Sequence, residues 1–207
     1  MAPVAGRRVC VYCASSTHDP RLLAIATEVG DAIARRGWSL VSGGGNVSMM
    51  GAVAEAARAG GARTVGVIPE GLRVREVADA SADELVVVTT MRERKREMEE
   101  RSDAFLTLPG GIGTMEEMFE VWTSASLGFH HKPVVLYDPI GFYTPLLDWV
   151  GGLADSGPVK THALDCLVGC DDLATALDAC GGRRGRADPR LRPPRCAAAR
   201  CRSSVPW

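Results

Sequence analysis

The chain alternates short runs of consecutive apolar residues with longer segments in which apolar residues recur at helical spacing. The apolar runs predict strands in residues 7–13, 63–69, 84–90, 103–109 and 132–138, and a strand followed by a loop in residues 38–45. The amphipathic segments predict helices in residues 19–37, 50–61, 91–101, 114–127, 142–154 and 171–179. The first helix has signals at both ends, with Asp19 as cap, Pro20 in the first turn and Gly37 as stop.

Continuous apolar runs are typical of strands buried on both faces, and each run here precedes a helical segment. The pattern therefore predicts an α/β fold, a doubly wound, Rossmann-like three-layer domain with a mostly parallel sheet. Ligands bind beyond the carboxyl ends of the strands in such a sheet. We therefore expect the binding site in the segments that follow the strands and share one rim, ASST, GGGNVS, MRERK and GGIGT.

Length and charge divide the chain into a body and a tail. Its 207 residues are 46% hydrophobic and 24% charged, which suits one globular domain in residues 1–182. Residues 183–207 hold eight arginines against one aspartate, so, with a net charge of −1 for the whole chain, the body carries about −8. We predict that this Arg/Pro-rich tail is disordered; the alternative is a tail that binds anions.

Two observations exclude other classes of protein. The chain has no apolar run near the roughly 20 residues of a membrane span, and no apolar stretch follows its first arginines, so we expect a cytoplasmic protein without a membrane partner. The seven cysteines are irregularly spaced, and Cys10 and Cys13 belong to an apolar segment rather than to a helix start. We therefore expect buried or free thiols, no metal site and no cofactor.

Glycine-rich turns form the candidate anion site. Gly110, Gly111 and Gly113 lead into a predicted helix at Thr114, where backbone N–H groups can approach a phosphate without interference from a Cβ. A second glycine loop, at residues 43–45, falls on the same predicted rim and strengthens this interpretation. Neither loop fits the dinucleotide-binding fingerprint or the Walker pattern, because the required glycine and lysine spacings are missing.

The charged segment at residues 91–102, MRERKREMEERS, has two interpretations. Its alternating signs at helical spacing are typical of a solvated helix face with ion pairs, which suits most of its charges. Arg94 and Lys95, however, lie in the first turn after a buried strand, on the side shared with Met91 and Met98. Cations are unfavourable at a helix N-terminus, so we expect this pair to face a compensating anion at the rim.

Glu117 also has two interpretations that spacing alone does not separate. Thr114 and Glu117 fit the T-x-x-E capping box, in which the glutamate reaches back to the N–H of the cap residue. A carboxylate in the first helical turn beside a phosphate-binding loop is equally suited to catalysis. Glu116 points elsewhere around the helix, and we expect it to be exposed to solvent.

A set of motifs in consistent order resembles one family. PGGIGTMEE at 109–117 is similar to the PGGxGTxxE motif of the LOG (lonely guy) family, the cytokinin riboside 5'-monophosphate phosphoribohydrolases, often labelled as lysine decarboxylases. The resemblance covers most of residues 8–180. It also includes the CASS loop, SGGG at 42–45, MG at 50–51, RE at 75–76, MRERK at 91–95 and LGxHxKP at 127–133.

The resemblance implies a homodimeric enzyme that hydrolyses the N-glycosidic bond of a nucleoside 5'-monophosphate, without a nucleic-acid partner. It implies that Arg94 and Glu117 are the catalytic pair. A carboxylate near the anomeric carbon suits an oxocarbenium-like transition state, whereas an arginine is a poor proton donor and is better suited to orienting groups. The resemblance and the rim loops together indicate substrate-binding roles for Ser15, Gly43, Gly44, Glu76, Lys95, Gly110, Gly111, Ile112, Gly113, Thr114, Met115, Glu116 and Thr123.

Two other functions stay open at this point. A pyridoxal-phosphate lysine decarboxylase needs a Schiff-base lysine, and Lys95 is the only lysine near the predicted rim. A sensor could bind a nucleotide at the same rim without catalysis, although Arg94 and Glu117 favour an enzyme. The base preference is open too, and the apolar residues near the rim loops that could contact a base are Met49, Met50, Trp122 and Phe129.

Overall fold

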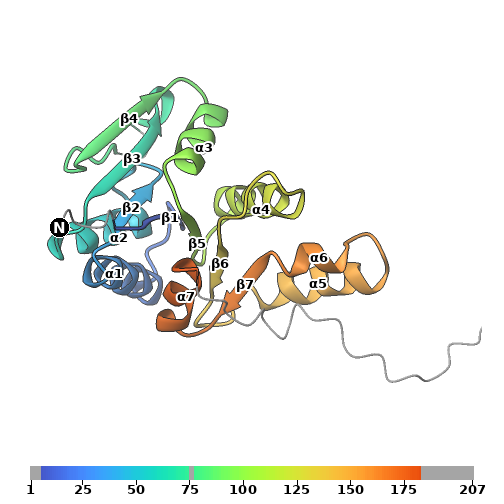
Figure 1. Cartoon of the computed structure of the whole chain (residues 1–207). Coiled ribbons are helices and arrows are strands. Elements are labelled where there is room, and N and C mark those ends of the chain that lie inside the picture. The colour runs from blue at the N-terminus through green and yellow to red at the C-terminus, as the bar shows by residue number, and fades with distance from the viewer. Residues whose placement is uncertain (1–5, 75–76, 183–207) are drawn as a thin grey trace, which may run out of the picture.

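The computed structural model describes residues 6–74 and 77–182. Strands and helices alternate along this part of the chain, as predicted (Figure 1). In chain order the elements are β1 (Arg8–Tyr12), α1 (Pro20–Arg35), β2 (Ser39–Ser42), α2 (Ser48–Ala59), β3 (Thr64–Pro69), the 3-10 helix η1 (Glu70–Leu72), β4 (Glu84–Val88), α3 (Met91–Glu100), β5 (Ala104–Thr107), α4 (Ile112–Ser126), β6 (Val134–Tyr137), α5 (Thr144–Asp155), α6 (Thr161–Leu164), β7 (Leu167–Cys170) and α7 (Leu173–Cys180).

The strands of the described residues form one seven-stranded sheet in the order β4-β3-β2-β1-β5-β6-β7. All neighbouring strands are parallel. From β1 the chain builds outward to β4, and from β5 it builds outward in the opposite direction to β7. The predicted doubly wound α/β fold is confirmed, and the strand order reverses between β1 and β5, where such folds bind ligands.

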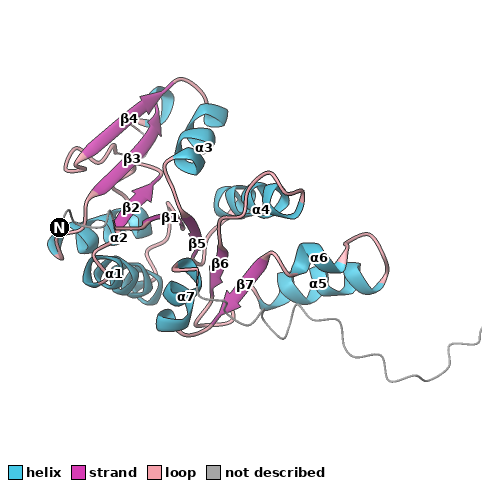
Figure 2. Cartoon of the chain, in the orientation of Figure 1, coloured by secondary structure: helices cyan, strands magenta, loops and turns pink. Residues whose placement is uncertain are grey.

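Helices cover both faces of the sheet, so the core has two halves (Figure 2). Along β1 the side chains alternate between these halves. Val9 and Val11 pack with α1, α2 and α7, whereas Cys10 and Tyr12 pack with α3, α4 and α5. This period-two alternation within a fully buried strand is expected where helices lie on both sides of a parallel sheet.

Helix α1 begins and ends where its sequence signals predict. The Asp19 carboxylate accepts a hydrogen bond from the backbone N–H of Arg21 at 2.9 Å, which caps the start of the helix beside Pro20. After Arg35 the chain leaves the helix, and Gly37 takes a left-handed conformation with φ of 65°. That conformation favours glycine, and the predicted stop at this residue is confirmed.

The sequence did not predict η1, α6 or β7. Strand β7 is four residues long and lies at an edge of the sheet within a mixed polar segment. Its pairing with β6, in which Val134 is opposite Leu167 and Tyr137 is opposite Cys170, supplies the order that its own sequence does not indicate. Helix α4 also begins at Ile112, two residues before the predicted start, which changes the interpretation of Glu117.

Two sequence-based predictions fall outside the described residues. These are the substrate-binding role of Glu76 and the disorder of residues 183–207. Within residues 6–74 and 77–182, no helix has both the length and the apolar character that crossing a bilayer requires.

Candidate active site

A pocket of about 270 Å³ lies where the loops after β1 and β5 meet, at the reversal of the strand order. Its walls come from the loop after β1, from α2, η1 and α3, and from the start of α4. The lining residues are Cys13, Ala14, Ser15, Ser16, Met50, Leu72, Met91, Arg94, Gly111, Ile112, Gly113, Thr114, Glu116 and Glu117. Five segments distant in the sequence therefore converge on one pocket.

Arg94 lies in the wall of this pocket with its guanidinium held by two carbonyl groups. Its Nε donates to the oxygen of Val67 at 3.1 Å, and its Nη2 donates to the oxygen of Gly43 at 2.8 Å. The residue is only 5% exposed. These contacts fix the plane of the guanidinium, which a lysine could not reproduce because its ammonium lacks the planar fork.

Gly43 is required by the position of Arg94. A Cβ at Gly43 would lie 2.0 Å from the Arg94 Nη2 atom, so any side chain there would displace the guanidinium. The second glycine loop therefore acts on the candidate site by holding Arg94 through the carbonyl oxygen of Gly43. Gly43 itself does not line the pocket.

The start of α3 is fixed by a capping box that the sequence analysis did not identify. The Thr90 hydroxyl accepts from the backbone N–H of Glu93 at 3.2 Å, and the Glu93 carboxylate accepts from the backbone N–H of Thr90 at 3.1 Å. Glu93 is thus a cap, and Arg94 follows it directly on the helix. The capping box holds the helix start that places Arg94 in the pocket wall.

The capping-box interpretation of Glu117 is wrong. The N-cap of α4 is Gly111, so Thr114 is the third residue of the helix and Glu117 lies in its second turn. Thr114 is buried, and its side chain packs against the backbone of Gly110, where a Cβ would lie 2.2 Å from the Thr114 Oγ1 atom. The helix starts early because Gly110 leaves room for Thr114, which frees Glu117 from a capping role.

The Glu117 carboxylate lies close to the end of β1. Burial raises the pKa of the Cys10 and Cys13 thiols and of the Tyr12 phenol, and the negative charge of Glu117 raises each further. The thiol of Cys13, which also lines the pocket, therefore stays protonated and is not a nucleophile. Among the residues that line the pocket, Glu117 and Arg94 are therefore the charged groups suited to catalysis.

The phosphate-binding candidate is the loop that precedes α4. Gly111 and Gly113 line the pocket, and a Cβ at either position would meet no described atom within 4 Å. Gly111 is the N-cap of α4 and Gly113 lies in its first turn, where backbone N–H groups have no acceptor within the helix. These groups are therefore suited to an anion, and the helix dipole favours negative charge there.

Tyr143 and Asp138, which the sequence analysis did not identify, support the start of this loop. The Tyr143 hydroxyl donates to the oxygen of Leu108 at 2.9 Å. The Asp138 carboxylate accepts from the backbone N–H groups of Phe142 and Tyr143 at 2.7 and 2.8 Å. Both Asp138 and Tyr143 are buried, so the start of the glycine loop rests on a rigid support. The available signal was an aspartate that follows a strand and lies six residues before the start of α5.

A buried ion pair holds the other glycine loop. The carboxylate of Asp79, which is 3% exposed, binds the Arg58 Nη1 atom at 2.6 Å. The backbone N–H of Asp79 donates to the oxygen of Gly44 at 2.9 Å, and that of Asn46 donates to the oxygen of Val77 at 2.8 Å. Residues 77–79 are thereby tied to the loop that carries Gly43.

Lys95 faces protein carboxylates rather than the pocket. Its Nζ contacts the carboxylate of Glu116 and lies 2.9 Å from that of Glu120. Burial opposes the charged form, but the hydrogen bonds to Glu116 and Glu120 outweigh it and raise the pKa of Lys95. The compensating anion expected for Lys95 is therefore supplied by α4. Glu116, which also lines the pocket, is exposed as expected.

The remaining predicted residues divide between the core and a second groove. Gly44, Gly110 and Met115 lie outside the pocket lining. Thr123 lines a separate groove of about 470 Å³ between α4, α5 and α6, together with Trp122 and Trp149. Of the apolar residues considered for a base pocket, Met50 lines the pocket, Met49 is fully buried and Phe129 is 79% exposed.

The cysteines and acidic residues show no metal chemistry in the part of the chain that the structure describes. No group of three or more His, Cys, Asp or Glu side chains there is arranged to hold a metal ion. Cys10, Cys13, Cys166 and Cys180 are thiols outside any disulfide bond, and all but Cys166 are buried.

Comparison with known proteins identifies the family of the chain. Residues 50–180 match the family model described as "Possible lysine decarboxylase". Over 172 residues, 83% of the chain and 92% of the relative, the chain is 56% identical to the cytokinin riboside 5'-monophosphate phosphoribohydrolase of Mycobacterium tuberculosis. The chain belongs to this phosphoribohydrolase family. An Arabidopsis thaliana member is 40% identical over 177 residues, which cover 83% of the chain and 81% of that relative.

Solved structures with low sequence identity to the chain share its fold. The molybdenum cofactor binding protein of Rippkaea orientalis superimposes with a TM-score of 0.67 at 18% identity, covering 86% of the chain and 98% of that protein. At this identity the likeness concerns the architecture alone. The fold therefore carries different ligands, and the function of a family member has to be argued from its site.

Proposed function

We propose that the chain hydrolyses the N-glycosidic bond of a cytokinin riboside 5'-monophosphate and releases the free base and ribose 5-phosphate. The observation that carries this proposal is the meeting of Arg94, Glu117 and the Gly111–Gly113 loop in one pocket. The support from relatives is the 56% identity to an enzyme of this name.

The pocket offers a separate group for each part of the substrate. The accessible N–H groups of the loop before α4 suit the 5'-phosphate. The apolar side chains of Leu72, Met91 and Ile112 line the same pocket, which suits a base with an apolar substituent. The ribose then lies between them, beside Glu117.

Glu117 has the charge and position that glycoside cleavage needs. The departure of the base leaves positive charge on the sugar ring, and a carboxylate next to the anomeric carbon stabilises this charge and can orient the attacking water. Arg94 remains a cation throughout and is a poor proton donor. Its fixed guanidinium is suited to orient Glu117 and to bind substrate oxygens.

The decisive experiment is incubation of the purified protein with N6-isopentenyladenosine 5'-monophosphate and with AMP, followed by chromatography of free base and ribose 5-phosphate. The matched control is the corresponding nucleoside, which lacks the phosphate. We expect stoichiometric release of both products from the monophosphate and at least about a hundredfold lower kcat/KM for the nucleoside. Tight binding of the nucleotides without cleavage would instead establish the sensor function.

A lysine decarboxylase, which the description of the family model suggests, is a weaker candidate. Such an enzyme needs a lysine free to form a Schiff base with pyridoxal phosphate. Lys95 is engaged by two carboxylates of α4 and lies outside the pocket lining. Incubation with pyridoxal phosphate and lysine should therefore give neither imine absorbance nor carbon dioxide.

We propose further that the enzyme is a homodimer whose second copy covers the groove that contains Thr123. Leu127 and Trp149 line this groove and are 65% and 61% exposed, which forms an apolar surface of the kind that marks protein interfaces. Light scattering on the full chain should give twice the chain mass, and Trp149→Glu should give a monomer. A monomeric parent protein at micromolar concentration would contradict this assembly.

A further inference from the structure

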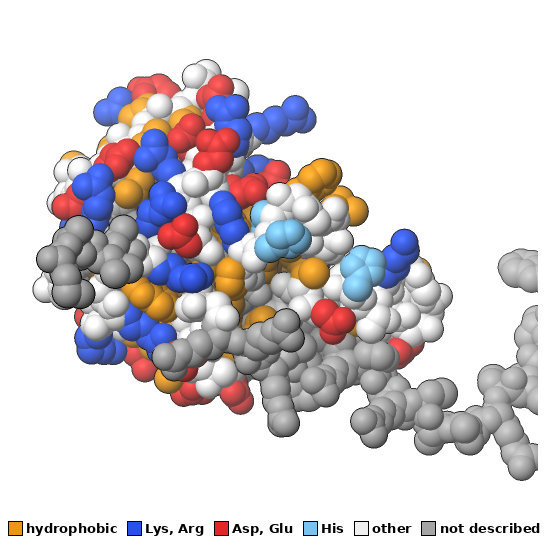
Figure 3. All heavy atoms as spheres, in the orientation of Figure 1, with side chains coloured by type: hydrophobic (Ala, Val, Ile, Leu, Met, Phe, Trp, Pro, Cys, Tyr) orange, Lys and Arg blue, Asp and Glu red, His pale blue; other side chains and the backbone are white. Residues whose placement is uncertain are grey.

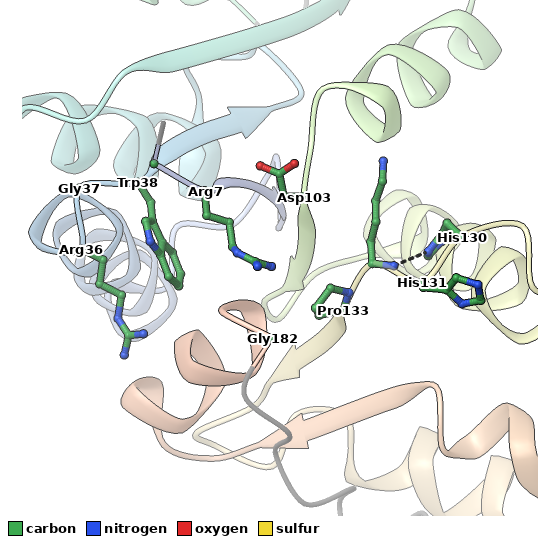
Figure 4. Close-up of a pocket in the computed structure, with 11 residues that line it drawn as sticks. Arg7, Arg36, Gly37, Trp38, Asp103, His130, His131, Pro133 and Gly182 are labelled. Atoms are coloured by element: carbon green, nitrogen blue, oxygen red, sulfur yellow. Dashed lines mark hydrogen bonds between the residues drawn. The ribbon is translucent and has the colours of Figure 1, made fainter. Parts of the chain in front are cut away.

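A second and larger hollow lies at the amino ends of the strands, whereas the candidate active site lies at their carboxyl ends. It has a volume of about 1060 Å³ and is lined by residues just before β1, β2, β5 and β6 and by Gly182 after α7 (Figure 4). Its lining includes Arg7, Arg36, Trp38, Asp103 and Lys132. Because these positions precede the strands, no residue of the hollow belongs to the pocket that contains Glu117.

The charge of this hollow is positive although the body of the chain is acidic. Arg7, Arg36 and Lys132 line it as cations. Arg36 pairs with Asp178, which is not among the described lining residues, with a nitrogen–oxygen distance of 2.8 Å. Asp103, the one carboxylate among the described lining residues, binds Arg8 outside the hollow with a nitrogen–oxygen distance of 3.0 Å, so Arg7 and Lys132 carry the excess positive charge. Figure 3 shows Lys and Arg side chains mixed with Asp and Glu side chains over one face of the molecule. A concave site with excess positive charge inside an acidic protein favours an anionic ligand.

The cations are held in place but keep donors for a ligand. The Arg7 Nη1 atom donates to the oxygen of Cys180 at 2.6 Å, and the Lys132 Nζ atom donates to the oxygen of Glu99 at 2.6 Å. Each side chain forms this one hydrogen bond among the described residues. Because a guanidinium has five N–H donors and an ammonium has three, both side chains have further donors for a ligand. Figure 4 shows the Arg7 guanidinium directed into the middle of the hollow.

An aromatic ring completes the site. The Trp38 indole stands beside Arg7 in the hollow (Figure 4), and the Arg36 guanidinium lies 5.1 Å from the centre of its ring. A cation over an indole holds the ring and lends positive charge to its surroundings. An indole between two guanidinium groups suits a ligand that has both a flat aromatic ring and an anionic group.

We propose that this hollow is a second binding site, for a nucleoside phosphate, in which Arg7 binds the phosphate, Trp38 contacts the base and Lys132 supplies further positive charge. Arg36, which is paired with Asp178, holds the Trp38 ring in place. A volume near 1000 Å³ is large enough for a nucleotide. The chain's own tail is excluded as the occupant by its charge, because residues 183–207 hold eight arginines and one aspartate. The inference is independent of catalysis at Glu117.

The test counts AMP molecules bound per chain by equilibrium dialysis. The full-length Glu117→Gln chain serves as the parent, since it should not consume the ligand, and we expect two bound molecules. Arg7→Gln combined with Lys132→Gln keeps a donor for Cys180 and for Glu99 while it removes two charges. This double variant should bind one molecule, with the affinity of the remaining site unchanged within about twofold. Arg35→Gln, an exposed position beside Arg36 outside the hollow, is the matched control and should bind two.

The ligand class is tested with two fragments of AMP. Adenosine and ribose 5-phosphate should each bind the hollow at least about tenfold more weakly than AMP, because each lacks one of the two recognised groups. Trp38→Phe should weaken the binding of AMP more than the binding of ribose 5-phosphate. One AMP per parent chain that the double variant still binds, or two per double variant, would overturn the proposal. One AMP per parent chain that the double variant loses would support the hollow and place the failure at the pocket that contains Glu117. Loss of oligodeoxythymidylate binding in the double variant without loss of AMP binding would assign the hollow to a polyanion instead.

Discussion

Asp79 binds Arg58 with an Oδ2–Nη1 distance of 2.6 Å and also donates its backbone N–H to the oxygen of Gly44 at 2.9 Å. Gly44 follows Gly43, whose carbonyl oxygen accepts a hydrogen bond from Arg94. A continuous series of contacts therefore runs from the ion pair between Arg58 on α2 and Asp79 before β4 to the guanidinium in the pocket. We expect this ion pair to set the orientation of Arg94.

Asp79→Asn should lower turnover without abolishing folding. Asparagine keeps the shape and the backbone contacts of Asp79, but it leaves the charge of Arg58 without its partner. We expect kcat to fall by about tenfold and KM to change by less than about threefold, because the glycine loop before α4 is untouched. The control is Asp178→Asn, which removes the partner of Arg36 at the opposite edge of the sheet and should leave kcat unchanged. Equal loss in both variants would point to general destabilisation.

Glu117→Gln should separate binding from chemistry. The substitution removes the negative charge but keeps the size of the side chain, so the free energy of unfolding should change by less than about 1 kcal/mol. Turnover should fall by roughly a hundredfold or more, because the oxocarbenium-like transition state loses its counter-charge, while the nucleotide still binds at the loop. Glu116→Ala is the control and should have a mild effect. Hydrolysis at the parent rate by Glu117→Gln would refute the catalytic role.

Arg94→Lys should damage catalysis although it preserves the charge. A lysine can contact one of the two carbonyl groups of Val67 and Gly43 but cannot hold both in one plane. We expect kcat/KM to fall by about a hundredfold or more. Arg92→Lys, an exposed position on the same helix, is the matched control and should retain full activity. Near-normal kinetics of Arg94→Lys would show that the bidentate geometry is unimportant.

Tyr143→Phe should loosen the loop before α4. The change removes the hydroxyl that donates to the oxygen of Leu108. The buried carbonyl of Leu108 then loses this hydrogen bond, which lowers the free energy of unfolding by about 1–3 kcal/mol. Because the support lies beneath the phosphate-binding loop, KM for the monophosphate should rise more than kcat falls. Thermal unfolding and steady-state kinetics measure the two effects. A stability loss with an unchanged KM would confine Tyr143 to the core.

The sequence alone determined the fold class, and it predicted the candidate site at the carboxyl ends of the strands. Continuous apolar runs indicate strands buried on both faces, and this signal depends only on residues within each run. The same holds for the caps of α1, since Asp19 and Gly37 act on their own neighbours. Strand β7 escaped prediction because its order comes from pairing with β6 and not from its own residues.

Only the tertiary structure decided the roles of individual charges around the site. Whether Glu117 caps α4 or faces the pocket depends on where the helix begins, and this is set by the packing of Thr114 against Gly110. Lys95 is turned away from the pocket because α3 packs beside the carboxylates of α4. Contacts between elements far apart in the chain, such as the bond from Arg94 to Gly43, arise from packing and leave no periodic signal in the sequence, because periodicity records only which face is buried and not which partner buries it.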